Sequence, residues 1–270
     1  MGYFVGVEPD VKVFIEDLNP AGKKAVLFLH GWPLNHQAFE YQLNQIPKSG
    51  IRCIAMDMRG FGRSDKPWDS YSYDRLADDL YQVIGLLGLR DITLAGHSMG
   101  GAVAIRYMAR HGGRGVGRLA LLGAAAPSFV KRTDFNWGFQ REEVTGWVKQ
   151  CYDNRPQLLK DFGDMFFFKY VTSSIKDWFF QLGLAAAGWS TAACLISLRD
   201  EELFSDLREI DVPTLILHGV HDKICPYPLA LAQKEAMKDA KLVPFETSGH
   251  GLFYEEWGKL NYELEYFLKK

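Results

Sequence analysis

Residues 92–101, ITLAGHSMGG, constrain this chain more than any other part of its sequence. A short apolar, strand-like segment runs directly into Gly-x-Ser-x-Gly, and a helical pattern follows at once. A serine at such a strand–turn–helix junction sits on a sharp, strained turn, where it is exposed as a nucleophile. Gly96 and Gly100 fit this interpretation, because a Cβ at either position would collide with a neighbouring strand or helix.

The five-residue pattern alone also fits an ordinary glycine-rich turn. A catalytic Ser98 needs three further groups: a base, an acid that orients the base, and N–H donors for an oxyanion. The rest of the chain supplies a candidate for each of them.

Apolar runs typical of buried strands recur along the chain and alternate with helical patterns. We predict strands at residues 3–7, 11–16, 25–29, 51–56, 92–95, 119–122, 214–218 and 241–245. Helical patterns cover residues 39–46, 73–87, the segment after Ser98, and the C-terminal segment from Trp257. This alternation predicts an α/β fold with a mostly parallel, doubly wound sheet. Such sheets carry their site at the carboxyl ends of the strands, and four polar residues directly follow predicted strands or lie within four residues of one: His30, Asp57, Ser98 and Asp222.

The strand–helix rhythm breaks in one long segment that is rich in aromatic residues and has no strand pattern. We interpret this segment, residues 131–199, as a helical cap. It is inserted into a single α/β core made of residues 1–130 and 200–270.

Aromatic side chains of a cap can roof a pocket. We expect Phe139 and Trp189 from the cap, together with Trp32 from the core, to contact a substrate. The alternative is that the aromatic residues only pack the cap onto the core.

An acid and a base follow Ser98 in the order Ser, Asp, His, which is the order expected for this architecture. Asp222 stands four residues beyond the predicted strand 214–218, and His250 lies between two glycines in the last strand-to-helix loop. Each has a plainer interpretation: Asp222 as a turn aspartate, and His250 as a loop histidine that caps or packs.

Six other histidines compete for the role of base. We interpret His30 as structural, His97 as pointing away from the serine, and His36 and His111 as helical surface residues. His218 and His221 flank Asp222, so a metal site from these three residues is an alternative. His250 fits best, because both its chain order and its loop agree with the role.

These motifs carry a family resemblance that covers the chain from end to end. Residues 30–33 (HGWP) look like the oxyanion loop of the α/β-hydrolase fold enzymes, and 96–101 (GHSMGG) like their nucleophile elbow. Residues 219–222 (GVHD) look like the family's acid loop, and 249–250 (GH) like its histidine loop. Residues 57–64 (DMRGFGRS) resemble a loop that is structural in the family. The chain is most similar to the small bacterial carboxylesterases and arylesterases, which are grouped with cofactor-free haloperoxidases and γ-lactamases.

The resemblance implies a serine hydrolase that cleaves small carboxylic esters through an acyl-enzyme. Ser98 is then the nucleophile, His250 the general base, and Asp222 the acid that orients the imidazole. The backbone N–H groups of Trp32 and Met99 bind the oxyanion. The implied reaction needs a small-molecule ester and water, and no metal or organic cofactor.

Other activities of the same fold stay open. Haloalkane dehalogenases and epoxide hydrolases of this fold use an aspartate nucleophile, so Ser98 speaks against both. Serine chemistry leaves amide or lactam hydrolysis, lipid-ester or thioester cleavage, and perhydrolysis. Some members keep the triad yet act as small-ligand receptors with a partner protein, so a signalling protein is the alternative from a different class.

Composition and charge limit the kinds of partner that we expect the chain to bind. The chain has 270 residues, is 47% hydrophobic and has a formal net charge of −2, with no basic run suited to nucleic acid. The N-terminal segment lacks the pattern of a signal peptide, and no apolar run is long enough to span a membrane. The four cysteines form no CxxC pair, which is typical of free thiols. We therefore expect a cytoplasmic protein that binds neither nucleic acid nor membrane. The sequence does not indicate its oligomeric state.

Overall fold

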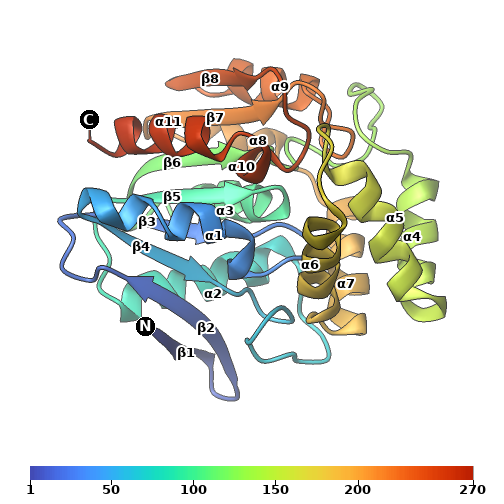
Figure 1. Cartoon of the computed structure of the whole chain (residues 1–270), viewed down its shortest axis with the longest axis horizontal. Coiled ribbons are helices and arrows are strands. Elements are labelled where there is room, and N and C mark those ends of the chain that lie inside the picture. The colour runs from blue at the N-terminus through green and yellow to red at the C-terminus, as the bar shows by residue number, and fades with distance from the viewer. Residues whose placement is uncertain (270) are drawn as a thin grey trace.

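A computed structural model describes residues 1–269 of the chain, and its centre is one sheet of eight strands (Figure 1). The strands lie in the order β1-β2-β4-β3-β5-β6-β7-β8. β1 pairs with β2, and β2 with β4, in antiparallel fashion, whereas the other pairs are parallel. The strands are β1 (Gly2–Glu8), β2 (Val11–Leu18), β3 (Lys24–Leu29), β4 (Ile51–Met56), β5 (Ile92–His97), β6 (Val116–Leu122), β7 (Thr214–Gly219) and β8 (Ala240–Phe245).

Helices cover both faces of this sheet. Figure 1 shows α1 and α11 over one face, and α2 and α3 over the other. All residues of β5 and β7 are therefore buried, which explains why these strands read as continuous apolar runs. The predicted α/β fold with a mostly parallel sheet is confirmed. Outside the cap, the helices are α1 (Glu40–Leu43), α2 (Tyr73–Leu86), α3 (Met99–Arg110), α8 (Phe204–Arg208), α9 (Pro228–Ala236), α10 (Leu252–Glu255) and α11 (Trp257–Lys269), with the 3-10 helices η1 (His36–Phe39) and η2 (Ile46–Ser49).

The helix predicted at residues 39–46 is not continuous. The segment is divided among η1, α1 and the first residue of η2. Pro47 lies in the first turn of η2 and has no N–H to donate to the carbonyl four residues earlier, so α1 does not continue through it. By contrast, α2 begins as its pattern predicts, with the Ser72 side chain accepting a hydrogen bond from the N–H of Arg75.

The segment 131–199, which we call the cap, lies between β6 and β7 in the chain. It holds α4 (Arg141–Asp153), α5 (Arg155–Phe166), α6 (Ser173–Leu184) and all but the last residue of α7 (Gly188–Asp200). Figure 1 shows these helices beyond the carboxyl ends of the parallel strands. The division into core and cap stays our interpretation. Within residues 1–269 no single helix is long and apolar enough to cross a membrane; α6 and α7 meet that test only as a pair, and the chain bends by 94° between them.

Candidate active site

Ser98 occupies the turn between β5 and α3. Its φ of 54° and ψ of −120° lie outside the regions that non-glycine residues favour. The turn is held by the Ser98 N–H, which donates to the carbonyl of Leu122 at 3.0 Å, and by the Ser98 carbonyl, which accepts from the N–H of Ala125 at 3.0 Å. Strain that the surroundings fix in this way is typical of functional positions.

The two glycines of the motif are required by close backbone contacts. A Cβ on Gly96 would lie 2.4 Å from the carbonyl oxygen of Gly100. A Cβ on Gly100 would lie 2.4 Å from the carbonyl oxygen of Leu29 and 2.5 Å from that of His30. The crowding predicted from the motif is therefore confirmed at both positions.

Asp222 follows β7 and uses its two carboxylate oxygens differently. Oδ1 accepts hydrogen bonds from the N–H groups of Ile224 and Cys225, both at 2.8 Å, so Asp222 does shape its own turn. Oδ2 lies 2.7 Å from Nδ1 of His250. Asp222 is therefore a turn aspartate, and the turn fixes the oxygen that faces His250; its role in orienting the imidazole stays a prediction.

His250 is fully buried in the loop between β8 and α10. Because a carboxylate only accepts hydrogen bonds, the neutral ring carries its proton on Nδ1 and its lone pair on Nε2. Within residues 1–269 the buried Nε2 has no hydrogen-bond partner. The ring edge-packs with Phe166 at a centroid distance of 5.0 Å and lies 4.6 Å from the ring of His97. His250 thus has the lone pair of a general base in an apolar setting.

Ser98 lies in the same cluster as this pair. The Ser98 N–H donates to the carbonyl of Leu122. A Cβ on the next residue, Gly123, would lie 3.4 Å from Oδ2 of Asp222 and 3.6 Å from Nδ1 of His250. No hydrogen bond joins Ser98 to Nε2 of His250 in the part of the chain that the structure describes. Such catalytic hydrogen bonds are often long before substrate is bound.

The candidate oxyanion donors flank Ser98. Met99 is the first residue of α3, where N–H groups lack intrahelical partners and the helix dipole favours negative charge. On the other side, a Cβ on Gly31 would lie 2.7 Å from the Cβ of Ser98, so the HGWP loop touches the serine. The Trp32 indole is buried and donates to the carbonyl of Thr191 at 3.0 Å. The oxyanion role of both N–H groups stays a prediction.

Other buried histidines are engaged elsewhere. Nε2 of His30 accepts from the N–H of Met58, its Nδ1 donates to the carbonyl of Gly31, and burial lowers its pKa to about 4. Burial also lowers the pKa of His97, which donates from Nε2 to the carbonyl of His250 at 3.1 Å. Both histidines are neutral supports of the loops around Ser98.

The histidines beside the acid do not form the alternative metal site. His218 donates from Nε2 to the carbonyl of Cys225 at 2.7 Å, and the ring of His221 stacks on Phe168. Among residues 1–269, no three His, Cys, Asp or Glu side chains are grouped to hold a metal ion. The four cysteines are free and buried.

The expectation that His36 lies on the surface is wrong. Its backbone N–H and its Nδ1 both lie 2.7 Å from Oδ1 of Asp57, and the residue is buried. Oδ2 of the same carboxylate accepts from the N–H of Arg63 at 2.8 Å. Burial alone would raise the pKa of Asp57, but the hydrogen bond from His36 and the other contacts hold it below its usual value. His36 therefore stabilises the DMRGFGRS loop, in agreement with the structural role that was expected of this loop.

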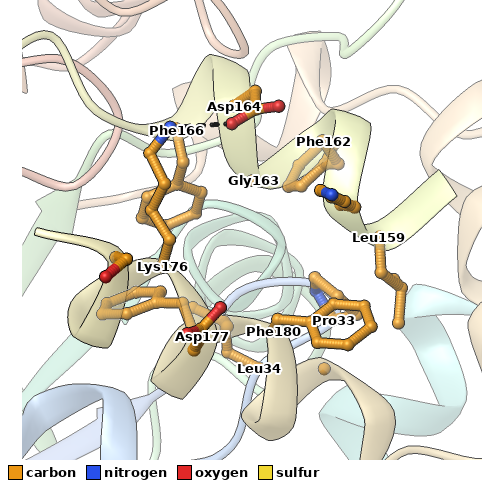
Figure 2. A pocket seen from close by; sticks show the side chains of 14 residues that line it. Pro33, Leu34, Leu159, Phe162, Gly163, Asp164, Phe166, Lys176, Asp177 and Phe180 are labelled. Carbon is orange, nitrogen blue, oxygen red and sulfur yellow. Dashed lines mark hydrogen bonds and ion pairs between the residues drawn. The ribbon is translucent and has the colours of Figure 1, made fainter. Parts of the chain in front are cut away.

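A cavity of about 250 Å³ lies between α5, α6 and the loop that follows Trp32 (Figure 2). Its walls are mostly apolar, and an ion pair of 2.9 Å between Lys176 and Asp164 joins α6 to α5 beside it. The lining residues are Pro33, Leu34, Leu159, Lys160, Phe162, Gly163, Asp164, Phe166, Ser173, Lys176, Asp177, Phe179, Phe180 and Gly183.

Two phenylalanines on α5 line this cavity and also contact residues of the proposed site. The ring of Phe162 edge-packs with Trp32 at 4.8 Å, and Phe166 packs on His250 as described above. Neither residue was predicted from the sequence as a substrate contact. The signal available was their spacing of four, which places both rings on one face of a helix.

The other predicted substrate contacts lie elsewhere. Phe139 packs on Trp147 at 4.7 Å, and the Trp189 indole donates to the carbonyl of Pro67 at 2.8 Å and packs beside Trp68. None of the three predicted contacts, Trp32, Phe139 and Trp189, lines the cavity. Their role toward substrate stays a prediction without support from the cavity.

The chain resembles known proteins over nearly its full length. A model of the alpha/beta hydrolase fold matches residues 24–256. The AB hydrolase superfamily protein YisY of Bacillus subtilis (strain 168) is 48% identical over 261 residues, which cover 97% of each chain. The non-heme chloroperoxidase CPO-A1 of Kitasatospora aureofaciens is 36% identical over 96% of this chain and 97% of its own. A solved structure, the esterase EaEST from Exiguobacterium antarcticum, has a TM-score of 0.97 and 39% identity, and covers 100% of both chains.

Proposed function

Because the chain belongs to the alpha/beta hydrolase fold family, as its motifs predicted, we propose that it is a serine hydrolase that cleaves small carboxylic esters through an acyl-enzyme on Ser98. One observation carries the proposal. Asp222 holds Nδ1 of His250 at 2.7 Å, and the opposite ring nitrogen is buried and unpartnered within residues 1–269, beside a strained elbow serine.

The proposed reaction has two halves. Nε2 of His250 takes the hydroxyl proton of Ser98 while Oγ attacks the ester carbonyl, and Asp222 stabilises the imidazolium that forms. The N–H groups of Trp32 and Met99 stabilise the tetrahedral oxyanion. The C–O bond to the alcohol then breaks, and the imidazolium gives its proton to the leaving alcohol.

Water completes the cycle. His250 removes a proton from a water molecule, which attacks the acyl carbon and forms a second tetrahedral oxyanion. Collapse of this intermediate releases the acid and returns the proton to Ser98. The reaction uses no metal and no organic cofactor.

The surroundings of the pair support this chemistry. The imidazole is enclosed by aromatic rings, and its acid is fixed by two backbone N–H groups. Electrostatic interactions are stronger in such a water-poor setting than in bulk water. The neighbouring apolar cavity offers room for the organic part of a small ester.

Perhydrolysis is a second candidate, favoured by the likeness to the bifunctional esterase/perhydrolase DCH of Acinetobacter calcoaceticus, which is 29% identical over 100% of both chains. Here hydrogen peroxide replaces water in the second half, so the acyl-enzyme yields a peroxycarboxylic acid and free Ser98. Peracid formed from acetate ester and peroxide, measured beside acetate formed from water, gives the ratio of the two reactions.

The test of the proposal is Ser98→Ala, with Ser205→Ala on α8 as the matched control. Hydrolysis of p-nitrophenyl acetate should fall by at least about 10³-fold in Ser98→Ala and stay unchanged in the control. A folded Ser98→Ala protein that keeps more than about a tenth of the wild-type kcat contradicts the proposal.

The same ester separates an enzyme from a receptor. We expect sustained turnover with a kcat on the order of 1–10³ s⁻¹. A burst of about one product per chain followed by a plateau, with every ester tried, would favour the receptor alternative instead.

A further inference from the structure

The carboxylate of Glu255, the last residue of α10, joins two segments that are far apart in the sequence. Its Oε1 accepts hydrogen bonds from the N–H groups of Phe168 at 2.7 Å and Lys169 at 2.6 Å. Its Oε2 accepts from the N–H of Gly249 at 2.7 Å. One side chain therefore binds the α5–α6 connection of the cap with one oxygen and the histidine loop with the other.

Further contacts keep the same two segments together. The N–H of Gly251 donates to the carbonyl of Phe166 at 3.0 Å. The ring of Phe168 stacks on His221 of the acid loop, with centroids 3.7 Å apart, and the His221 N–H donates to the carbonyl of Ser248 in the histidine loop at 3.1 Å. A Cβ on Gly249 would lie 2.9 Å from the backbone N of Phe168, so the loop meets the cap backbone directly.

The ionised form of the Glu255 carboxyl group is stabilised mainly by backbone N–H groups. Burial raises the pKa of its carboxyl, and the three N–H donors and the nearby Lys169 act against that shift. Three hydrogen bonds to an ionised acceptor are stronger than the same bonds to a neutral one. A carboxylate in this place is therefore suited to holding two backbone segments at a fixed distance.

The two joined segments each carry a part of the site. Of the two neighbours of His250, Gly251 donates directly to the Phe166 carbonyl of the cap, and Gly249 donates to Glu255, which in turn binds the cap. Phe166, whose carbonyl receives one of these bonds, lines the cavity and packs its ring on His250. A displacement of the α5–α6 connection would therefore move the cavity wall and the histidine together.

We propose that Glu255 is a positioning residue that fastens the cap to the histidine loop and so sets where Nε2 of His250 stands relative to Ser98. The kinetic part of this inference rests on the serine-hydrolase function proposed above. A misplacement of about 1 Å at a reacting group costs up to 10²-fold in rate.

Two substitutions separate the functions of the two oxygens. Glu255→Gln keeps one acceptor oxygen and presents an N–H₂ group to the other set of donors, so either the cap or the loop loses its partner. Glu255→Asp keeps both acceptors on a side chain one methylene shorter. The matched control is Glu256→Gln, because Glu256 accepts from Ser248 and Thr247 of the same loop. Glu256 has no bond to the cap.

The kinetic experiment counts active sites with an organophosphate that releases p-nitrophenol stoichiometrically, so that unfolded protein does not enter the rate. Per active site, Glu255→Gln should lower kcat by about 10- to 100-fold with KM nearly unchanged. The acidic limb of its kcat/KM profile should shift in pH. Glu255→Asp should recover part of kcat, and Glu256→Gln should stay near wild type. A kcat for Glu255→Gln equal to that of Glu256→Gln, with the same acidic limb, overturns the proposal.

Amide hydrogen exchange tests the coupling without any substrate. Glutamine removes the acceptor on one side only. If Glu255 joins the cap to the histidine loop, exchange should nevertheless become faster in both segments, at 166–169 and at 249–251. Faster exchange in one segment alone overturns the proposal, even if the protein hydrolyses no ester. If Glu255→Gln does not fold, Glu255→Asp carries both measurements, with smaller expected changes in the same directions.

Discussion

Hydrogen-bond partners, and not burial, distinguish the histidines near Ser98, because His250 is as fully buried as the other three. His30, His97 and His218 are fully buried, and desolvation of the charged form lowers the pKa of each. Each also holds a neighbouring backbone carbonyl with a ring nitrogen. His250 differs in its partner: its Nδ1 faces the Asp222 carboxylate at 2.7 Å instead of a backbone carbonyl, and its Nε2, which has no partner within residues 1–269, is on the opposite side of the ring.

A neutral buried histidine makes stability depend on pH. The folded pKa of His30 is about 4, below its reference value of 6.5. Between these values the unfolded chain binds more protons than the folded one, so stability falls as the pH drops through this window. By itself this histidine accounts for a loss of about 3 kcal/mol by pH 4.

The variant His30→Gln, which cannot titrate, should therefore show a shallower pH dependence. We expect it to be less stable than wild type at pH 7 but to lose less on acidification, as measured by urea unfolding at pH 7, 5.5 and 4. Parallel curves for the two proteins would show that His30 is not held neutral by the fold.

At the scale of elements, the β5–turn–α3 junction leaves no room for a side chain at its second glycine. Gly100→Ala would place a methyl group against the backbone of β3, which cannot yield as a side-chain tip can. We expect a loss of at least about 3 kcal/mol. Gly85→Ala in the exposed part of α2, where a Cβ meets nothing within 4 Å, should instead gain about 0.5–1 kcal/mol. Chemical denaturation of both variants checks the contrast, and a stable Gly100→Ala protein would contradict it.

Sequence patterns predicted the strands of the core better than the positions of individual side chains in the cap. The strand pattern works because buried parallel strands are apolar along their whole length, as β5 and β7 are. Phe162 and Phe166 were not predicted to lie at the site. Local periodicity shows that the two rings share one face of a helix, but it does not show which residues that face contacts. The prediction that His36 lies on the surface was wrong for a similar reason. Its hydrogen-bond partner, Asp57, is distant in the chain, so local sequence does not reveal the contact.

The α5 wall of the cavity gives a prediction about substrate size. Phe166→Ala should remove the ring that lines the cavity and packs on His250, and raise the relative kcat/KM for branched or aromatic acyl groups over acetyl by about 10-fold, in line with about 1–3 kcal/mol per pocket contact. The matched control is Phe139→Ala, which removes a cap ring that does not line the cavity. A panel of p-nitrophenyl esters measures both. A larger change of preference in Phe139→Ala would favour the original substrate-contact prediction over the cavity.

For the whole molecule, the core and the cap contribute different parts of the proposed site. The parallel sheet brings the loops that carry Ser98, Asp222 and His250 to one edge, as expected for this class of sheet. This much follows from chain order and strand positions. The size of the cavity does not, because it depends on how α5 and α6 pack against the HGWP loop.

The enclosed cavity predicts a preference for short esters. Its volume of about 250 Å³ lies at the lower end of small-molecule sites, and α5 and α6 form much of its wall. An acyl chain of twelve carbons would have to displace rings that pack on Trp32 and His250, at a cost of about 1–3 kcal/mol for overpacking. The ion pair between Lys176 and Asp164 is half exposed and adds little to closure.

We therefore expect kcat/KM for p-nitrophenyl acetate and butyrate to exceed that for the dodecanoate by at least about 10-fold, measured below the concentration at which the long ester aggregates. If kcat/KM instead rises steadily to the dodecanoate, the cap opens to an extended groove, and the small-ester part of the proposed function is wrong.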